Sequence, residues 1–422
     1  MTINLPLMKT EIMKIQSLLL KSRFYTGELN GIMDQATQNA VLYFQRSFDL
    51  EPTGIIDRAF LRAIQPLLLG YYMYTIKPGD TVYGIARQNY ITPAAILTAN
   101  PGVKPEQLVV GHQLVVPYRF PVVDTNIDSP YQILENDIMA LKVRYPFLEV
   151  SVAGISVLSR NLYCLKLGRG ENKVFYNASH HGLEWITSVL LMKFTEDFLR
   201  AYSEGDLING YDPREMWEQS TLYIMPMVNP DGVDLVLNGL QPDNPYYNEL
   251  LRWNNNNPDF SQTWQANNRG VDLNHNYNAA WNLSKEAESI YGITGPGPTR
   301  YSGPAPESEP ETRAVVNFTL ADDFRLAIAF HSQGEVIYWN FMDMATEEAR
   351  EIGENLSAIS GYLLDNTAGI ASYSGYKDWF IQEFRRPGYT IEVGKGRNPL
   401  PISQFDKIYR DNLGMLLYAA VV

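Results

Sequence analysis

Apolar side chains in residues 1–70 recur at helical spacing in three runs that are separated by turns. The runs contain Ile12, Ile15, Leu19 and Leu20, then Ala36, Ala40, Val41 and Phe44, then Phe60, Leu61 and Ile64. Turn-forming residues at 26–31 and 52–54 separate them. This spacing is typical of amphipathic helices, so the pattern predicts a small three-helix bundle.

Residues 74–117 show a different pattern, in which two short strands enclose two short helices. A strand over 74–76 leads into the turn Lys77–Asp80, and Thr81 is placed to cap a helix. Thr92 followed by Pro93 starts a second helix, because proline is favoured at the first helical position. A closing strand over Gln113–Pro117 completes a βααβ module.

Residues 121–422 alternate between apolar strands and helical stretches. The clearest strands are 174–177, 222–225, 326–330 and 389–391. Near-continuous apolar strands that alternate with helices indicate an α/β domain with a largely buried sheet. The short, proline-bounded segment 118–121 joins this block to the preceding module and predicts limited motion between them.

Composition narrows the classes of function. The chain has 422 residues and a net charge of −13, which argues against nucleic acid as the main partner. The one cysteine, Cys164, lies in an apolar run and predicts a buried thiol; a disulfide within the chain is excluded. We expect no membrane span, because no window holds about 18 or more consecutive apolar residues. We expect no classical export signal, because the first residues lack a basic region followed by an uninterrupted apolar stretch.

Candidate metal chemistry begins directly after the strand 174–177, in the stretch Asn177-Ala178-Ser179-His180-His181-Gly182-Leu183-Glu184. His181 and Glu184 are three residues apart, so the first turn of a following helix would direct both side chains the same way. This spacing alone also fits a helix-cap region with a surface glutamate. A catalytic zinc commonly takes two histidines and one glutamate.

A third ligand and a base are found at two other strand ends. His331 follows the strand 326–330 directly, and Glu392 ends the strand 389–391. A core-edge histidine and a salt-bridged glutamate are the alternatives. Because each ends an apolar strand and could reach the same cleft, His331 is predicted to be the third zinc ligand and Glu392 the general base.

Five segments in this order resemble the zinc metallocarboxypeptidases: HGLEWIT, VNPDG, RGVDLNHNYNAAW, AFHSQGEVIYW and YTIEVGKGRNPLPISQF. The resemblance spans residues 121–422. It implies a central mixed sheet flanked by helices. It also implies one zinc ion on His181, Glu184 and His331, with Glu392 as the general base. Residues 1–70 resemble the peptidoglycan-binding helical domains through Gln16, Gly31, Thr37 and neighbouring positions. Residues 74–117 resemble LysM domains, which recognise glycans that contain N-acetylglucosamine.

The sequence departs from the family pattern where a substrate would bind. The family triplet Asn-Arg-Asn is Asn274-His275-Asn276 here, so Asn274 matches and His275 replaces the arginine that grips a terminal carboxylate. The family arginine that follows a tryptophan is also replaced, because Gln265 follows Trp264. Arg269 is a candidate for that role. Tyr373 and Tyr376 are both candidates for the mobile family tyrosine.

This combination is similar to the γ-D-glutamyl-L-diamino acid endopeptidases, which cut peptidoglycan stem peptides between D-Glu and diaminopimelate. From their residue types, His275, Arg269 and Arg397 are candidates for recognition of the stem. We expect synthesis without a classical signal, in the cytoplasm, and association with a cell or spore wall. Two other hypotheses stay open: a carboxypeptidase that trims free or wall peptides, and a non-catalytic peptidoglycan-binding protein.

Overall fold

The computed structural model describes residues 7–367 and 369–422. The chain divides into two compact units, which are described separately. The first contains residues up to 128, with 132–148 and 196–206; the second contains 129–131, 149–195 and 207–422.

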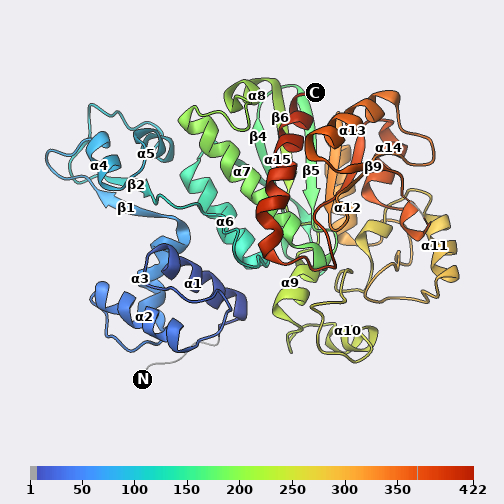
Figure 1. The fold of residues 1–422 in the computed structure, drawn as a ribbon, viewed down its shortest axis with the longest axis horizontal. Coiled ribbons are helices and arrows are strands. Elements are labelled where there is room, and N and C mark those ends of the chain that lie inside the picture. Colours follow the sequence, from blue (N-terminus) through green and yellow to red (C-terminus); the bar gives the residue numbers. More distant parts are fainter. Residues whose placement is uncertain (1–6, 368) are drawn as a thin grey trace. The chain divides into compact units, whose positions relative to one another are not determined.

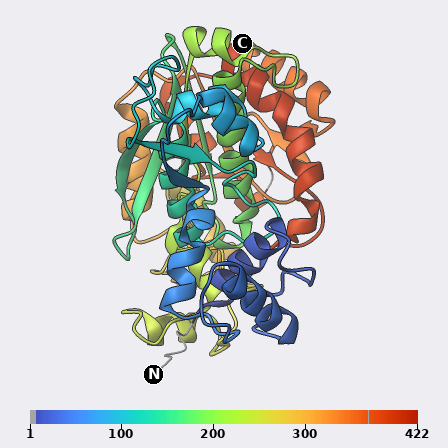
Figure 2. The ribbon, with the colours of Figure 1, turned by 90° about the vertical axis from the view of Figure 1, so that its left-hand side faces the viewer.

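The first unit begins with the predicted bundle of helices α1 (Lys9–Lys21), α2 (Gln35–Ser47) and α3 (Arg58–Leu69). They pack together around buried aromatic rings, as Figures 1 and 2 show in blue. Gln16 is fully buried, and its amide bonds Thr37 Oγ1 at 2.8 Å and the backbone N–H of Gly31 at 2.9 Å. This buried network joins α1 to α2 and explains why a polar residue stands in the apolar stripe.

The predicted βααβ module follows as β1 (Tyr71–Thr75), α4 (Val82–Gln88), α5 (Pro93–Ala99) and β2 (Gln113–Pro117). Strands β1 and β2 are antiparallel. Thr81 and Thr92 cap the helices as expected, since each hydroxyl accepts the backbone N–H of the residue three positions later. The first strand begins at Tyr71 rather than at 74, because Gly70 ends α3 in the left-handed conformation and the chain continues directly into the strand.

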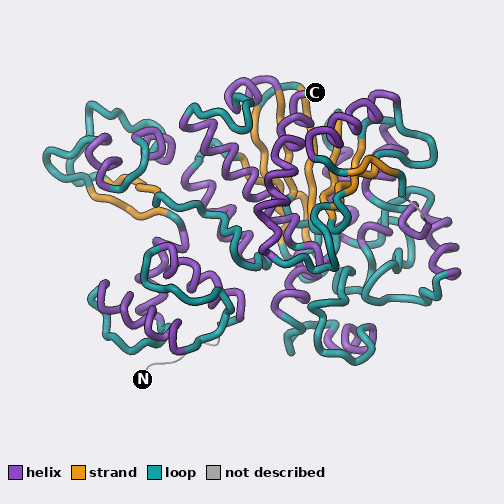
Figure 3. The backbone as a smooth tube through the Cα atoms, viewed as in Figure 1, coloured by secondary structure: helices purple, strands orange, loops and turns teal. Residues whose placement is uncertain are grey.

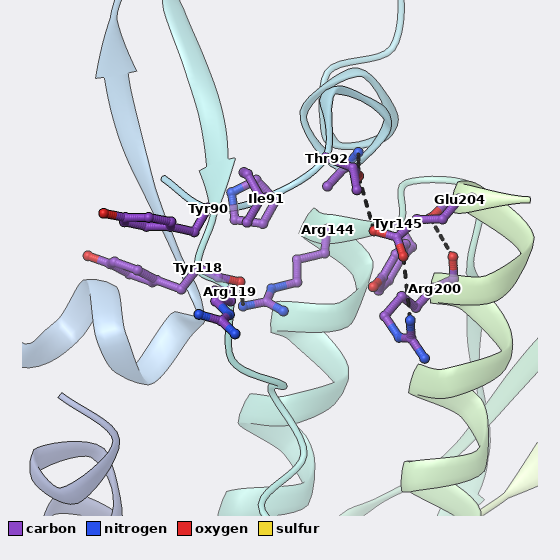
Figure 4. A pocket seen from close by; sticks show the side chains of 12 residues that line it. Tyr90, Ile91, Thr92, Tyr118, Arg119, Arg144, Tyr145, Arg200 and Glu204 are labelled. Atoms are coloured by element: carbon purple, nitrogen blue, oxygen red, sulfur yellow. Dashed lines mark hydrogen bonds and ion pairs between the residues drawn. The ribbon is translucent and has the colours of Figure 1, made fainter. Parts of the chain in front are cut away.

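A cavity within this first unit is lined by Tyr90, Tyr118, Arg119 and Arg200, among others (Figure 4). Glu204 accepts a hydrogen bond from Thr92 at 3.1 Å and pairs with Arg200 at 3.4 Å. The lining of this cavity contains tyrosines and arginines but no histidine, and the predicted zinc ligands all belong to the second unit.

The second unit is built on an eight-stranded mixed sheet, drawn in orange in Figure 3, with the strand order β3-β4-β6-β5-β7-β10-β8-β9. The strands are β3 (Glu149–Ile155), β4 (Asn161–Gly168), β5 (Asn172–Ala178), β6 (Ser220–Met225), β7 (Leu326–His331), β8 (Val336–Tyr338), β9 (Leu363–Asp365) and β10 (Gly388–Glu392). Its centre, β6-β5-β7-β10, is parallel and corresponds to the four predicted strands. The predicted fold class, a mixed sheet flanked by helices, is confirmed.

Helices cover both faces of this sheet, and adjacent residues of β5 show how. Phe175 packs against Phe318 of α12 (Pro310–Leu320) and Tyr376 of α14 (Tyr376–Phe384). Tyr176 faces the opposite side, where its hydroxyl donates to the Leu416 carbonyl of α15 (Phe405–Val421) at 2.8 Å. Figure 1 shows α15 in red in front of β5 and β6. Side chains of successive strand residues therefore pack into the apolar layers on opposite faces of the sheet, as expected for a sheet buried on both faces.

The remaining helices connect or flank these elements. They are α6 (Tyr131–Arg144), α7 (Ile186–Glu204), α8 (Pro213–Gln219), α9 (Pro230–Asn238), α10 (Tyr247–Trp253), α11 (Trp281–Ile290) and α13 (Glu347–Ser360), with short 3-10 turns η1 (Gly182–Glu184), η2 (Leu273–His275), η3 (Gly369–Ser372) and η4 (Ile402–Gln404). Cys164 on β4 is 1% exposed, in agreement with the predicted core thiol. Among the described residues, no helix combines the length and apolar character needed to cross a membrane.

Glu311, in the first turn of α12, is fully buried and accepts hydrogen bonds from the Val157 N–H at 2.9 Å and from Asn267 at 3.2 Å. Burial and the nearby charge of Asp231 raise the pKa of Glu311 to about 8. A raised carboxyl pKa means that the folded state binds the proton more tightly than the unfolded state. Stability should therefore fall as pH rises from about 4.5 to about 8.

We expect Glu311→Gln to remove this component of the pH dependence. Between pH 5 and pH 9 the Tm of the unsubstituted protein should fall further than that of the variant, by about 2–4 °C for each 1 kcal/mol involved. Thermal melts at several pH values measure this difference. Glu354→Gln is a matched control, because that carboxylate is exposed. Parallel Tm curves for the Glu311 variant and the unsubstituted protein would contradict the prediction.

Candidate active site

Three polar segments meet at one edge of the sheet because they follow neighbouring parallel strands. β5 ends at Ala178, just before His180 and His181, while β7 ends at His331 and β10 at Glu392. Parallel strands place their carboxyl ends at the same edge, which is where open α/β sheets bind ligands. Segments more than 200 residues apart in the sequence thus share one site.

His181, Glu184 and His331 form a tight cluster at this edge. The Glu184 carboxylate lies between the two imidazoles, with Oε1 2.9 Å from Nδ1 of His181 and Oε2 2.8 Å from Nδ1 of His331. One atom from each of the three side chains lies within 4.8 Å of the others. In the part of the chain that the structure describes, this is the one group of three such side chains arranged to hold a metal ion.

The local backbone is a 3-10 turn, not the first turn of an α-helix as predicted. His181 precedes the turn η1 in an extended conformation, and α7 begins only at Ile186. A 3-10 helix has three residues per turn, so positions i and i+3 still lie over each other. The three-residue spacing therefore aligns Glu184 with His181, although the helix type differs.

Gly182 is required at this turn because the backbone is crowded from outside. A Cβ at this position would lie 2.5 Å from the Gly232 carbonyl oxygen and 3.0 Å from that of Trp264. The Gly182 N–H also donates to the Gln265 carbonyl at 3.0 Å. The absence of a side chain lets the ligand-bearing turn pack directly on α9 and on the segment that follows Trp264.

Asn229, in the segment VNPDG, holds these pieces together. Its side-chain amide lies within 3.2 Å of the carbonyl oxygens of His180, Gln265 and Ala266, while its oxygen accepts the Gly232 N–H at 2.9 Å. Asn229 is fully buried. This conspicuous sequence motif is therefore a scaffold for the cluster rather than part of its chemistry.

Asp272 orients His181, a role that the sequence analysis did not assign. Its Oδ1 lies 3.0 Å from Nε2 of His181, and its Oδ2 accepts the Arg300 N–H at 2.8 Å. An ionised carboxylate only accepts hydrogen bonds, so Nε2 carries a proton and Nδ1 faces Glu184. The one signal in the sequence was a carboxylate two residues before Asn274.

The charges of the cluster stabilise one another. Burial alone would raise the pKa of Glu184, but the two imidazoles outweigh burial and lower it to about 2. Burial alone would lower the pKa of His181, but Glu184 and Asp272 raise it well above its ordinary value. His181 is thus held between two carboxylates, an environment that also suits a divalent cation.

Glu392 lies beside this cluster without belonging to it. It is the partner of His331 in the β7–β10 register, and the Val393 N–H donates to the His331 carbonyl at 2.8 Å. Burial first, and then the negative charge of Glu184, raise the pKa of Glu392 well above its ordinary value. A carboxyl group with a raised pKa next to a cation site has the properties of a general base.

The predicted substrate-binding residues fall into two groups. The Asn274 side-chain oxygen accepts the Tyr376 N–H at 3.0 Å, which leaves its amide N–H groups for another partner. His275 is buried, and burial lowers its pKa, so the imidazole is neutral at pH 7. Tyr373 is half-buried. Asn274 and His275 directly follow Asp272 in the chain, and Tyr373 lies just before α14.

Arg269 and Tyr376 are engaged elsewhere. Arg269 approaches the buried Glu309 at 3.7 Å and bonds the Tyr246 hydroxyl at 3.3 Å. Tyr376 is 1% exposed, and its ring packs against Phe175 while its hydroxyl contacts Thr319 at 3.2 Å. Tyr376 is therefore fixed in the core, and the half-buried Tyr373 stays the candidate for the mobile tyrosine.

Asn398 is a second residue that the sequence analysis missed. Its amide nitrogen lies 3.3 Å from Oε1 of Glu184, and its oxygen accepts the Ser332 hydroxyl at 2.8 Å. It thereby links the loop after β10 to the residue that follows His331. Nothing in the spacing of this loop identified Asn398, because the contact depends on how the loop turns back to the sheet.

Comparisons with known proteins agree with this geometry. The sequence profile of zinc carboxypeptidases matches residues 134–415, that of a peptidoglycan-binding domain matches 9–64, and that of the LysM domain matches 74–117. These matches confirm the three resemblances noted from the sequence.

Individual relatives give the same result. The chain is 43% identical over 287 residues to γ-D-glutamyl-L-diamino acid endopeptidase 1 of Lysinibacillus sphaericus, covering 68% of this chain and 71% of that protein. It is 36% identical over 286 residues to the uncharacterized protein YqgT of Bacillus subtilis, covering 67% and 74%. Bovine thrombin-activatable fibrinolysis inhibitor, solved with a tick carboxypeptidase inhibitor, shares the fold, with a TM-score of 0.52 and 20% identity over 69% of this chain and 96% of that chain.

Proposed function

The chain belongs to the zinc carboxypeptidase family, and on that premise we propose that it is a zinc-dependent peptidoglycan hydrolase that cleaves the γ-D-glutamyl–diamino acid bond of stem peptides. The named relative at 43% identity is an endopeptidase of this type. The matches to peptidoglycan-binding and LysM profiles support peptidoglycan as the partner.

One zinc ion held by His181, Glu184 and His331 is the cofactor of this proposal. Two imidazole nitrogens and one carboxylate are a donor set that suits zinc, and the three ligand atoms already face one another within 4.8 Å. A metal-bound imidazole is neutral, so binding would displace the proton from Nδ1 of His181 while Asp272 retains its bond to Nε2. The ion would supply a Lewis acid that polarises the scissile carbonyl and lowers the pKa of water.

Glu392 takes a proton from the attacking water in this mechanism and returns it to the leaving amine. Its burial and the adjacent charge of Glu184 raise its proton affinity, which favours the first transfer. The return of the proton is required because an amide nitrogen leaves as an amine. Asn274 and Tyr373 are proposed to orient the substrate beside it.

The observation that carries the choice of an endopeptidase is the buried, neutral His275. Burial lowers its pKa, and its position is the one where the family pattern has an arginine. A neutral imidazole offers one donor and no charge, whereas guanidinium grips a terminal carboxylate with two parallel bonds. Selection for a free peptide C-terminus is therefore weakened, and a bond inside the stem becomes accessible.

The proposal also assigns a separate role to each domain of the chain. Residues 1–70 and 74–117 would bind the wall, and residues 121–422 would carry the peptidase. Association with a cell or spore wall follows from these binding modules.

The test is mass spectrometry of defined tri- and tetrapeptide muropeptides after incubation with the zinc-loaded protein. We expect release of the fragment that contains the diamino acid from both stems, and also from a tetrapeptide whose terminal carboxylate is amidated. Stepwise loss of C-terminal residues, blocked by amidation, would identify a carboxypeptidase instead. An intact γ-D-glutamyl bond with zinc bound would refute the proposed specificity.

Asp272→Asn should weaken zinc binding by about 10–100-fold, because the outer partner of a metal-bound histidine fixes its tautomer and raises its basicity. An asparagine of the same shape loses the charge that holds Nε2–H of His181. Zinc titration against a competing chelator measures the affinity. Asp323→Asn is the control, since that side chain is 83% exposed and pairs with Arg386. Equal affinities for the Asp272 variant and the unsubstituted protein would argue against an orienting role.

A further inference from the structure

Two positions where the family pattern has arginine carry no cation in this chain, although the proposed substrate is rich in carboxylates. Gln265 follows Trp264, and its side-chain oxygen accepts a hydrogen bond from Thr299. His275 is buried and neutral, and its Nδ1 has no recorded hydrogen bond. The cationic function must therefore be absent or come from another segment.

The segment 298–301 is fixed to both of these places by its backbone. The Pro298 carbonyl accepts the N–H groups of Gln265 at 2.8 Å and Ala266 at 3.0 Å. The Arg300 N–H donates to Asp272 Oδ2 at 2.8 Å, and the Asp272 N–H donates to the Tyr301 carbonyl at 2.8 Å. The backbone of Arg300 is thus fixed by a hydrogen bond to Asp272, the residue that orients His181.

The side chain of Arg300 is available to a ligand. It is exposed, and no ion pair or hydrogen bond of its guanidinium is recorded among the described residues. Its positive charge acts on His275, where it adds to the effect of burial in lowering the pKa of that imidazole. Arg269, the earlier candidate, differs because it is already paired with the buried Glu309.

We propose that Arg300 is the substrate-binding cation of this site, and that it grips a carboxylate of the stem peptide next to the scissile bond. The proposal rests on the function proposed above. It assigns to the segment 298–301 a role that the sequence pattern led us to expect at Arg269.

The chemistry of the substrate supports a guanidinium here. A γ-linked D-glutamyl residue keeps a free α-carboxylate on the acyl side of the scissile amide, and diaminopimelate has a distal carboxylate on the leaving side. An ordinary α-linked peptide bond has no α-carboxylate on its acyl side. Two parallel hydrogen bonds from Arg300 to such a group would distinguish a γ-linked stem from an ordinary peptide.

The test is a double-mutant cycle in which one change is made in the enzyme and the other in the substrate, with kcat/KM as the measured quantity. Zinc-loaded unsubstituted protein and R300Q are compared on a stem peptide, on its D-Glu α-carboxamide, and on a peptide amidated at the diamino acid. R300Q should lower kcat/KM on the carboxylate substrate by about 10–150-fold. On the analogue that lacks the carboxylate bound by Arg300, R300Q and the unsubstituted protein should have the same kcat/KM. The zinc content of the two proteins should also be the same. R300K, which keeps the charge without the fork, should lie between.

Each outcome has a definite meaning. Loss of the R300Q effect on the α-carboxamide places the contact on the acyl side, and loss on the other analogue places it on the leaving side; both support the proposal. The proposal is overturned if R300Q has the same effect on all three substrates, or if it has no effect. It is also overturned if R397Q, and not R300Q, loses its effect on one of the two analogues. If the unsubstituted protein leaves the γ-bond intact, the proposed function fails. Peptide affinity for E392Q against E392Q/R300Q then decides whether Arg300 binds the carboxylate.

Discussion

Replacing Glu392 by glutamine is expected to lower kcat on stem peptides by about 10²–10⁴-fold while the zinc content stays unchanged. Glutamine has nearly the same shape but cannot accept a proton at neutral pH. Glu392 is not among the three clustered ligands, and it adjoins them only through the strand register with His331. The loss should therefore appear in turnover, with little change in substrate affinity.

Glu335→Gln is the matched control for this experiment. Glu335 lies four residues after His331, but its carboxylate pairs with Lys395 and Lys407 at 2.7 Å each. Its kcat should stay within about twofold, because this carboxylate pairs with two exposed lysines and is not one of the three clustered ligands. A Glu392 variant that retains full turnover would remove the general-base role. A variant that loses zinc would show instead that Glu392 belongs to the metal site.

The central strands and the ligand cluster could be predicted from sequence because each signal is local. The strands 326–330 and 389–391 are continuous apolar runs, and each ends in one conspicuous polar residue, His331 or Glu392. A residue at the end of a buried strand is placed by the strand itself. The structure pairs these two strands in parallel, and parallel strands place their carboxyl ends at the same edge of the sheet, so the two side chains converge.

Other parts of the site depend on contacts that no local pattern encodes. Asp272 meets His181 across 91 residues, and Asn398 meets Glu184 across 214. The last two strands on one side of the sheet, β8 and β9, have only three residues each, too few for a periodic signal. Arg269 was chosen for its closeness in sequence, whereas the structure pairs it with Glu309 and brings the backbone of Arg300 to Asp272.

Substituting His331 by alanine should reduce zinc affinity by more than about 100-fold and abolish hydrolysis. Loss of an outer-shell partner already costs about 10–100-fold, and His331 contributes a ligand atom directly. The imidazole is 1% exposed and lies 2.8 Å from Glu184, so no neighbouring water-exposed group can replace it. Equilibrium dialysis with metal analysis should give one zinc per chain for the unsubstituted protein and a small fraction of that for the variant.

The zinc-dependent change in Tm separates this effect from a general loss of stability. A ligand at 1,000 times its Kd stabilises the folded state by about 4 kcal/mol, so zinc should raise the Tm of the unsubstituted protein clearly. His331→Ala should melt at the same temperature with and without zinc, even if its cavity lowers that temperature. His112→Ala, an exposed histidine of the βααβ module, should keep the full zinc response. A zinc response that survives in His331→Ala would mean that the ion is held by other residues, and the proposed cluster would be wrong.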